Sequence, residues 1–210
     1  MKKRIVIVDS HVSIRDMLVW ILMQETGYEV IGEAGSGIDA IKVCGSSRPD
    51  LLILDLALPC ISGAEVLRRV RKELPLTRVL IYTGTRSSVL IKEALRERPH
   101  GYADKHEGLK LLKKAISMVA NGGSFFGEPA SHLMYETTGT TPEQSDLSPR
   151  EREILQMVAE GRSSKQISGL LDVALKTVEN HRANLMAKLG MHDVASLTLY
   201  AARRGMVPIE

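Results

Sequence analysis

The first 127 residues alternate short apolar runs with amphipathic stretches, and this alternation restricts the fold more than any other feature. The apolar runs predict strands at residues 4–8, 28–34, 51–54 and 78–82, with a weaker fifth strand at 101–103. Between them, apolar residues recur at helical spacing, as in the stripe from Ile14 to Leu22. Strands that are almost continuously apolar are typical of a sheet buried on both faces. The pattern predicts a doubly wound, flavodoxin-like parallel α/β sheet of five strands.

The rest of the chain divides into a polar segment and a helical region. Residues 128–146 are rich in Thr, Gly, Pro and Ser and hold four acidic residues with no Lys or Arg, which predicts a flexible linker. From residue 147 only helical periodicity remains, beginning with a capping box at Ser148 and Glu151 and Pro149 at the first helical position. We therefore predict one domain at 1–127, a linker at 128–146, and a small all-helical domain at 147–210.

Four polar residues follow strands of the predicted sheet. Asp9, Asp55 and Thr83 each end a strand, and the weak fifth strand leads into Lys105. Ligands of open parallel sheets bind beyond the carboxyl ends of the strands, so we expect these side chains to converge. A carboxylate can accept a phosphoryl group as an aspartyl phosphate, and such transfer needs cations to neutralise charge. The residue types therefore predict a phosphoryl-transfer site with oxygen ligands for Mg²⁺.

These residues give the chain a specific resemblance. Residues 1–125 resemble the receiver domain of two-component response regulators, and 147–210 resemble the LuxR-type helix-turn-helix domain of the NarL/FixJ class. The resemblance implies that Asp55, in LLILDLALP, is phosphorylated by a histidine kinase or a small phosphodonor. It also implies a metal site for Mg²⁺ at Asp9, Asp55 and the backbone carbonyl of Ala57. The switch and phosphoryl-binding residues would be Thr83, Tyr102 and Lys105.

One residue departs from the family pattern. Where the family has two acidic residues in a row after the first strand, this chain has Asp9 followed by Ser10. A neutral hydroxyl is a weaker ligand than a carboxylate for a hard divalent cation. We therefore expect weaker Mg²⁺ binding and slower phosphorylation of Asp55, or its loss.

The helical region carries a candidate DNA reader. A helix-turn-helix places its second helix in the major groove, and the candidate pair is 164–171 and 175–189. A helical wheel puts Val178, Leu185 and Leu189 inward, with Leu175 near them, and turns Asn180 and Ala183 outward. Asn can read adenine in two hydrogen bonds, while Lys and Arg bind phosphates. By spacing and resemblance, the predicted DNA-binding residues are Lys176, Thr177, Glu179, Asn180, His181, Arg182, Ala183, Asn184 and Lys188.

Three functions remain open at this point. The leading one is a phosphorylation-controlled DNA-binding transcription regulator, active as a homodimer, with a histidine kinase and RNA polymerase as partners. The second keeps DNA binding but uses the receiver only for docking or dimerisation, as Ser10 suggests. The third is an enzyme that hydrolyses a phosphate ester at Asp55; it lacks a neighbouring acid and a substrate-pocket motif, so we do not expect an enzyme.

Composition adds two expectations. Cys44 and Cys60 form no disulfide or zinc pattern, and no apolar stretch approaches the ~20 residues of a membrane helix, so we expect a cytoplasmic protein without a membrane partner. The net charge of +3 combines +5 in residues 1–127, −4 in 128–146 and +2 in 147–210. The DNA-binding region is thus only mildly basic, which favours binding as a pair.

Overall fold

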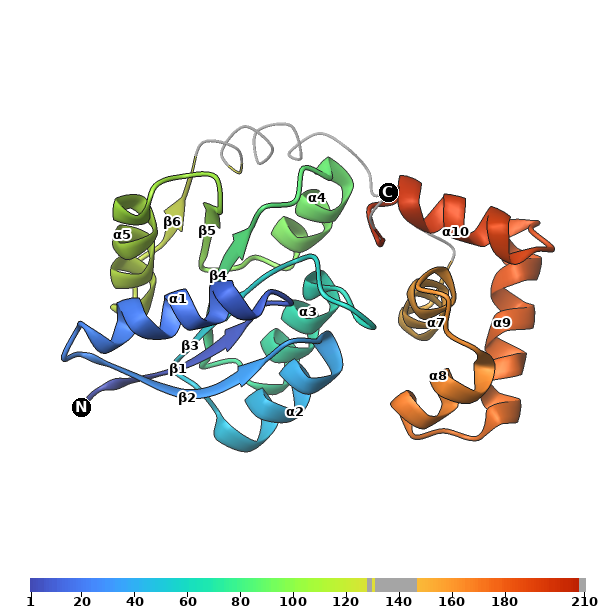
Figure 1. The fold of residues 1–210 in the computed structure, drawn as a ribbon, viewed down its shortest axis with the longest axis horizontal. Coiled ribbons are helices and arrows are strands. Elements are labelled where there is room, and N and C mark those ends of the chain that lie inside the picture. The colour runs from blue at the N-terminus through green and yellow to red at the C-terminus, as the bar shows by residue number, and fades with distance from the viewer. Residues whose placement is uncertain (128–129, 131–146, 208–210) are drawn as a thin grey trace.

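The computed structural model describes residues 1–127, 130 and 147–207, and it shows an α/β part followed by a helical part (Figure 1). The predicted linker at 128–146 lies outside the described residues, Ala130 excepted. Among the described residues, no helix has both the length and the apolar character needed to cross a membrane.

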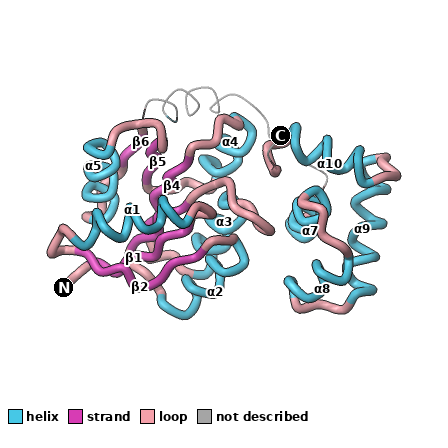
Figure 2. Tube along the Cα trace, in the orientation of Figure 1, coloured by secondary structure: helices cyan, strands magenta, loops and turns pink. Residues whose placement is uncertain are grey.

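The α/β part alternates strands and helices in the predicted order (Figure 2). Its strands are β1 (Lys3–Val8), β2 (Tyr28–Ala34), β3 (Leu51–Leu54), β4 (Arg78–Thr83), β5 (Gly101–Asp104) and β6 (Phe125–Phe126). Its helices are α1 (Val12–Met23), α2 (Gly37–Ser47), α3 (Gly63–Glu73), α4 (Ser88–Arg96) and α5 (Leu109–Ala120). All strand pairs are parallel, in the order β2-β1-β3-β4-β5-β6. The predicted parallel sheet is confirmed.

The prediction of five strands is wrong by one. After α5 the chain runs along the edge of β5, where Phe125 N donates to His100 O and Gly127 N donates to Tyr102 O. These bonds form β6, a strand of only two residues. Two residues are too few to show the alternation by which a strand is recognised in a sequence.

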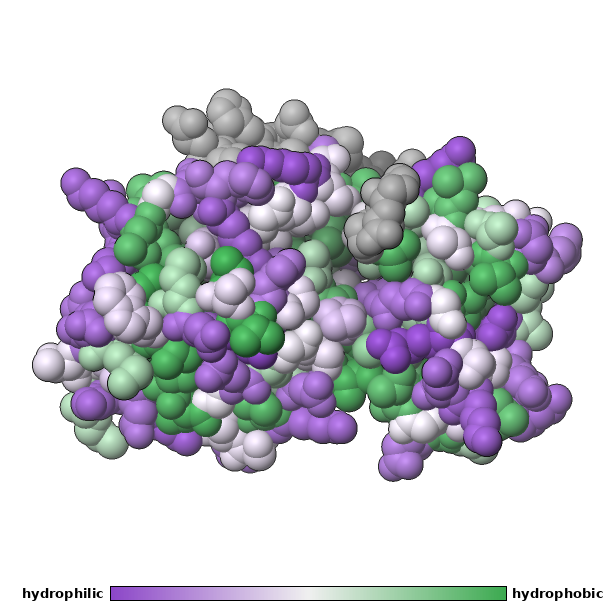
Figure 3. Space-filling view, in the orientation of Figure 1, coloured by the Kyte–Doolittle hydropathy of each residue, from purple (hydrophilic) through white to green (hydrophobic). Residues whose placement is uncertain are grey.

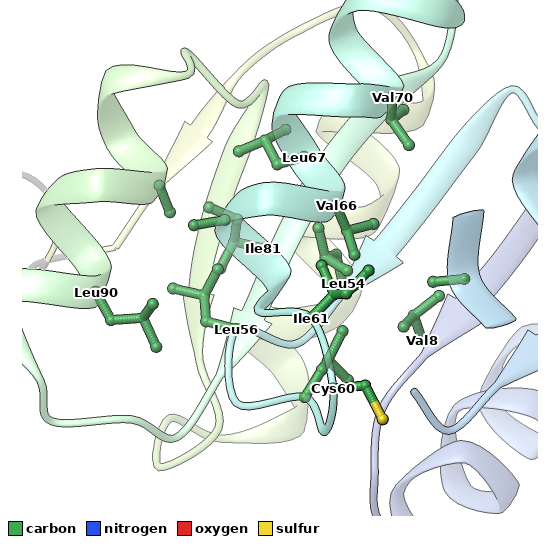
Figure 4. Close-up of a cluster of buried hydrophobic side chains, with 14 of the residues drawn as sticks. Val8, Leu54, Leu56, Cys60, Ile61, Val66, Leu67, Val70, Ile81 and Leu90 are labelled. Atoms are coloured by element: carbon green, nitrogen blue, oxygen red, sulfur yellow. The ribbon is translucent and has the colours of Figure 1, made fainter. Parts of the chain in front are cut away.

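The sheet is covered on both faces, as its apolar strands require. Alternate residues of the strands point to opposite faces, so β1 gives Ile5 and Ile7 to one core and Val6 and Val8 to the other. The first core packs against α1 and α5, and the second against α2, α3 and α4. In Figure 4, Val8, Leu54 and Ile81 from three strands lie near Val66 and Leu67 of α3. On the viewed surface, hydrophobic residues occur in small groups between hydrophilic ones (Figure 3).

The helical part consists of α7 (Pro149–Ala159), α8 (Ser164–Leu171), α9 (Leu175–Leu189) and α10 (Val194–Arg203). The capping box predicted at the start of α7 is present: the Ser148 side chain accepts from Glu151 N, and the Glu151 carboxylate accepts from Ser148 N. Gly161 and Gly190, which follow α7 and α9, have φ values of 81° and 63°. These left-handed conformations favour glycine and end the helices.

Candidate functional site

The site lies where β1, β3, β4 and β5 end, because parallel strands bring their carboxyl ends to one edge of the sheet. Asp55 follows β3, and its side chain is almost fully buried, with 2% exposed. Thr83 Oγ1 donates to Asp55 Oδ1 at 2.6 Å, and Lys105 Nζ donates to Asp55 Oδ2 at 2.6 Å. Both oxygens of this carboxylate are therefore held by residues from neighbouring strand ends.

Lys105 also approaches the second carboxylate of the site. Its Nζ atom lies 2.6 Å from Asp9 Oδ2 as well as 2.6 Å from Asp55 Oδ2, so one ammonium bridges the two carboxylates. Burial alone would lower the pKa of Lys105. The negative charges of Asp55 and Asp9 have the opposite effect and are stronger, so the pKa of Lys105 is raised. The ammonium thus stays charged and neutralises part of the charge of two buried carboxylates.

The described residues include one cluster whose side chains can hold a metal ion. It consists of Asp9, His11 and Asp55, whose ligand atoms lie within 4.8 Å of one another. Ala57, whose carbonyl oxygen we expected to bind Mg²⁺, is close by: its amide donates to Asp55 Oδ1 at 3.3 Å. The Ser10 hydroxyl donates to Ala57 O at 3.4 Å, a long hydrogen bond that leaves the second lone pair of this carbonyl free. The two carboxylates suit Mg²⁺, whereas the neutral hydroxyl and the nearby imidazole do not.

Tyr102, the predicted aromatic switch, is fully buried on β5. Burial, followed by the charge of Asp104, raises the pKa of its phenol to about 12, so it stays neutral. The ring belongs to the core on the side of α2, α3 and α4. In the sheet it pairs with Ile81, two residues before Thr83 on β4.

Helix α9 presents the predicted DNA-binding residues on its free face. Val178 and Leu185 are fully buried, as the wheel predicts, while Leu175, placed near the inward side, is 44% exposed because it opens the helix. Most of the predicted contact residues are exposed, and three are half-buried: Thr177, His181 and Arg182. The outward face is thus open to a partner along the whole helix.

Two of the predicted phosphate-binding residues already have protein partners. Lys188 Nζ donates to Glu151 Oε2 at 2.8 Å, and this contact lowers the pKa of the carboxyl against the effect of burial. Arg182 Nη1 donates to Ser164 Oγ at 2.9 Å and so joins α9 to α8. Lys176, by contrast, has an 80% exposed side chain, with Glu179 at 3.6 Å. Lys176 is therefore more accessible to DNA phosphates than Lys188 or Arg182 is.

The loop between β3 and α3, which begins at Asp55, contacts the helical part directly. Gln156 Nε2 of α7 donates to Leu58 O at 2.8 Å. Two residues farther on, Cys60 N donates to Glu160 Oε1 at 2.8 Å. Burial, and after it the charge of Glu160, raises the pKa of the Cys60 thiol. Asp55, which follows β3, is thus linked to α7 through one short loop.

Charged residues extend this contact, which we call the domain interface. Glu153 of α7, with 2% of its side chain exposed, pairs with Arg69 of α3 and with Arg150 at 3.0 Å. Farther out, Arg152 pairs with Glu93 of α4 at 3.0 Å, and both side chains are at least 32% exposed. No local sequence pattern predicts the domain interface; its trace in the sequence is the helical spacing of Glu153, Gln156 and Glu160.

A cavity of about 950 Å³ lies above the site. One wall comes from the α/β part and includes Ser10, His11, Asp55 and Lys105. The opposite wall comes from the helical part and includes Glu160, Ala202 and the segment 205–207. The cavity is large enough for a phosphoryl group, and both parts of the chain shape it.

Comparisons with known proteins agree with both parts of this description. Residues 5–117 match the response regulator receiver domain, and residues 145–201 match the luxR family of bacterial regulatory proteins. The virulence-factor transcription regulator BvgA of Bordetella pertussis is 33% identical over 212 residues, covering 98% of this chain and 100% of BvgA. The DNA-binding transcriptional activator DevR/DosR of Mycobacterium tuberculosis is 33% identical over 202 residues, covering 94% of this chain and 93% of that relative.

A solved structure shows the same fold. RcsB of Salmonella enterica serovar Typhimurium, bound to a promoter in the presence of phosphomimetic BeF3-, superposes with a TM-score of 0.61 at 23% identity. The match covers 97% of this chain and 99% of RcsB. With a receiver-type sheet, a helix-turn-helix and full-length relatives that regulate transcription, the chain belongs to the NarL/FixJ class of two-component response regulators.

Proposed function

We propose that this DNA-binding transcriptional regulator is controlled by phosphorylation of Asp55. The observation that carries the proposal is the position of the Asp55 carboxylate between the two parts of the chain. Asp55 is buried between Thr83 and Lys105, opens into a cavity, and begins the loop that binds α7. A phosphoryl group added there would alter both the site and the domain interface.

The residues of the site have distinct tasks in this proposal. A carboxylate oxygen of Asp55 attacks the phosphorus, and the donor's P–N or P–O bond breaks as the new O–P bond forms. Lys105, now shared between Asp55 and Asp9, turns to a phosphoryl oxygen, and Thr83 donates its hydroxyl to another. Tyr102 follows Thr83 as the neighbouring buried aromatic. A divalent cation held by Asp9, Asp55 and the Ala57 carbonyl would neutralise charge on the transferred group.

The output is DNA binding by α9. Asn180 and Ala183 face bases, with Glu179 beside them, while Lys176 and the remaining predicted contacts position the helix on phosphates. RcsB, which shares the fold, has been solved on a promoter and as two dimers on two DNAs. We propose that this chain likewise binds duplex DNA as a homodimer, with a histidine kinase or small phosphodonor upstream and RNA polymerase downstream.

Phosphorylation is tested with acetyl phosphate and Mg²⁺, followed by intact-mass measurement. We expect a single phosphoryl adduct that is absent from Asp55→Asn, and faster formation in Ser10→Asp, which restores the family's second acid. No adduct under any condition would refute control by phosphate. DNA binding that persists in that case would instead support the alternative, in which Ser10 marks a receiver used only for docking or dimerisation.

DNA recognition is tested by selecting binding sites from random duplexes and comparing variants. Asn180→Ala should relax base preference at one position, by about 1–3 kcal/mol of discrimination. Lys176→Ala should weaken binding to all duplexes alike and reduce the slope of log K against log salt by about 1. Lys110→Ala, an exposed lysine on α5, is the control. Equal losses on selected and random DNA for both α9 variants would contradict the assignment.

A further inference from the structure

A groove rich in arginine lies between the carboxyl-terminal ends of α3 and α4 on the receiver domain. Its volume is about 590 Å³, and its described lining residues differ from those of the cavity at Asp55. Six cations and two carboxylates line it: Arg68, Arg69, Arg71, Lys72, Arg96 and Arg98 against Glu73 and Glu97. Six cations against two carboxylates give the groove a formal charge of +4, whereas the whole chain carries only +3.

Neighbouring carboxylates neutralise only part of the charge of the groove. Arg68 and Arg69 pair with Glu65 at 2.7 and 2.9 Å. Arg71 lies 3.2 Å from the ring of His100, which is neutral because burial and the nearby arginines lower its pKa to about 4. The cations of the groove without an ion-pair partner among the described residues are Lys72, Arg96 and Arg98. Like charges this close repel one another, so a ligand with several negative charges would stabilise the groove.

The type of cation indicates the chemistry of that ligand. Five of the six cations are arginines, and a guanidinium group donates two parallel hydrogen bonds to phosphate oxygens. Helix dipoles favour cations in the last turns of α3 and α4, yet they do not place the cations of two helices around one groove. The groove therefore suits a chain of phosphates better than a single carboxylate.

A second cavity, of about 300 Å³, continues the groove toward the helical domain. The two spaces share Arg68, Arg96 and Glu97 in their walls, so one ligand can occupy both. The apolar walls of the second cavity come from both domains: Ala64 and Val89 from the receiver domain, and Leu147, Leu155, Tyr200 and Met206 from the helical domain. An apolar cavity with an aromatic wall suits a flat ring.

Glu97 lies at the junction of the groove and the second cavity. Its side chain is half-buried, and burial raises its pKa. A carboxylate at this place can accept hydrogen bonds from the hydroxyl groups of a ribose, as a carboxylate does in dinucleotide-binding folds. The order along the walls is thus apolar cavity, carboxylate and arginine groove, which matches the order of base, sugar and phosphates in a nucleotide.

We propose that the groove and the second cavity together bind a nucleoside polyphosphate. The base packs against Tyr200, the ribose hydroxyl groups donate to Glu97, and the phosphates lie among Arg96, Arg98 and the neighbouring cations. Because both domains line the second cavity, the ligand stabilises their docked arrangement. The site does not use Asp55 and therefore goes beyond the proposed function.

The test uses the full chain in EDTA without Mg²⁺, so that phosphorylation of Asp55 plays no part. ATP and GTP are titrated by calorimetry, beside adenosine and inorganic tripolyphosphate. We expect a nucleoside triphosphate to bind at least about 10-fold more tightly than either of its halves, because both halves are bound at once. Saturating ATP should also slow hydrogen exchange of the Cys60 amide, which donates across the domain interface, by up to about 100-fold at 100 times Kd.

Variants of exposed or half-buried residues locate the two halves of the ligand. Arg96→Ala combined with Arg98→Asn, which suits the left-handed backbone at φ 52°, should weaken ATP binding at least about 10-fold. Tyr200→Leu should weaken ATP binding about 2- to 10-fold and leave tripolyphosphate binding within about 2-fold. Lys110→Ala combined with Lys114→Ala removes two exposed cations of α5 and is the matched control, with unchanged ATP binding.

Four results would each overturn the proposal. They are the absence of nucleotide binding, equal binding of tripolyphosphate and ATP, equal losses in the arginine and lysine variants, and ATP binding that leaves exchange at Cys60 unchanged. Phosphorylation of Asp55 is measured separately with Mg²⁺, so its outcome is independent of this one.

Discussion

Glu153 is a buried charged residue of the domain interface, and replacing it should weaken the docking of the two domains. Its carboxylate is almost fully buried and accepts from Arg69 of the receiver domain and from Arg150 of its own helix. Glu153→Gln keeps the shape of the side chain and one hydrogen bond but removes the charge. Arg69 then keeps only Glu65, whose Oε1 lies 2.9 Å from Arg69 Nε.

The size of the effect follows from burial. Breaking a buried ion pair by removing one partner costs about 3–5 kcal/mol when the other charge is left without solvent. Here Arg69 is 31% exposed and retains Glu65, so solvent and a second carboxylate compensate part of the loss. We therefore expect docking of the domains to weaken by about 1–3 kcal/mol, or about 5- to 150-fold in the docking equilibrium.

The amide of Cys60 reports this equilibrium. It donates across the domain interface to Glu160 Oε1 at 2.8 Å, so it exchanges its hydrogen when the helical domain moves away. Exchange measured by NMR should accelerate about 5- to 150-fold in Glu153→Gln. Amides of β3 inside the sheet should keep their protection, since the receiver domain itself is unchanged.

A second ion pair across the domain interface serves as the matched control. Arg152 and Glu93 are 32% and 40% exposed, and exposed pairs contribute only about 0.2–1 kcal/mol. Glu93→Gln should therefore accelerate exchange at Cys60 by only about 5-fold or less. Equal acceleration in the two variants, or none in Glu153→Gln, would refute the argument from burial.

Two further predictions concern stability. Burial and neighbouring positive charges lower the pKa of His100 from 6.5 to about 4. As the pH falls, the unfolded chain therefore binds a proton at this histidine before the folded chain does. The free energy of unfolding, measured in urea, should fall as the pH drops from about 6.5 toward 4, and less steeply in His100→Asn than in His106→Asn. Gly205 has a φ of 71°, and a Cβ atom there would lie 2.1 Å from Ser87 Oγ. Gly205→Ala should lower the Tm by about 2–8 °C. Adding Ser87→Gly removes the clash and costs only a few tenths of a kcal/mol of helix capping, so the double variant should recover part of the lost Tm.

The sequence predicts the sheet and the convergence of Asp55 and Thr83 at its edge because both depend on local patterns. Buried parallel strands are continuously apolar, and a strand's carboxyl end brings the next residue to the ligand edge, which is why Asp55 and Thr83 are adjacent. The two-residue β6 and the exposure of Leu175 were not predicted, because end effects override periodicity.

The domain interface could not be predicted in the same way. Glu153 and Gln156 are polar residues on an amphipathic helix, and such residues normally face solvent. Gln156 is buried because its amide donates to the carbonyl of Leu58, and Glu153 is buried because Arg69 of α3 donates to its carboxylate. Glu160 in turn accepts from the amide of Cys60. These partners lie about 100 residues away in the sequence, so no local pattern relates them.

The domain interface also constrains how control by phosphate must work if Asp55 is the acceptor. Glu160 faces the same cavity as Asp55, so a phosphoryl group or beryllofluoride there adds negative charge opposite a carboxylate. Repulsion of like charges then weakens docking of the helical domain. Coupling between two equilibria is reciprocal, so docking must weaken the binding of beryllofluoride by the same factor. If the proposed phosphorylation of Asp55 acts in this way, Glu153→Gln should strengthen the binding of beryllofluoride by the same factor by which it weakens docking.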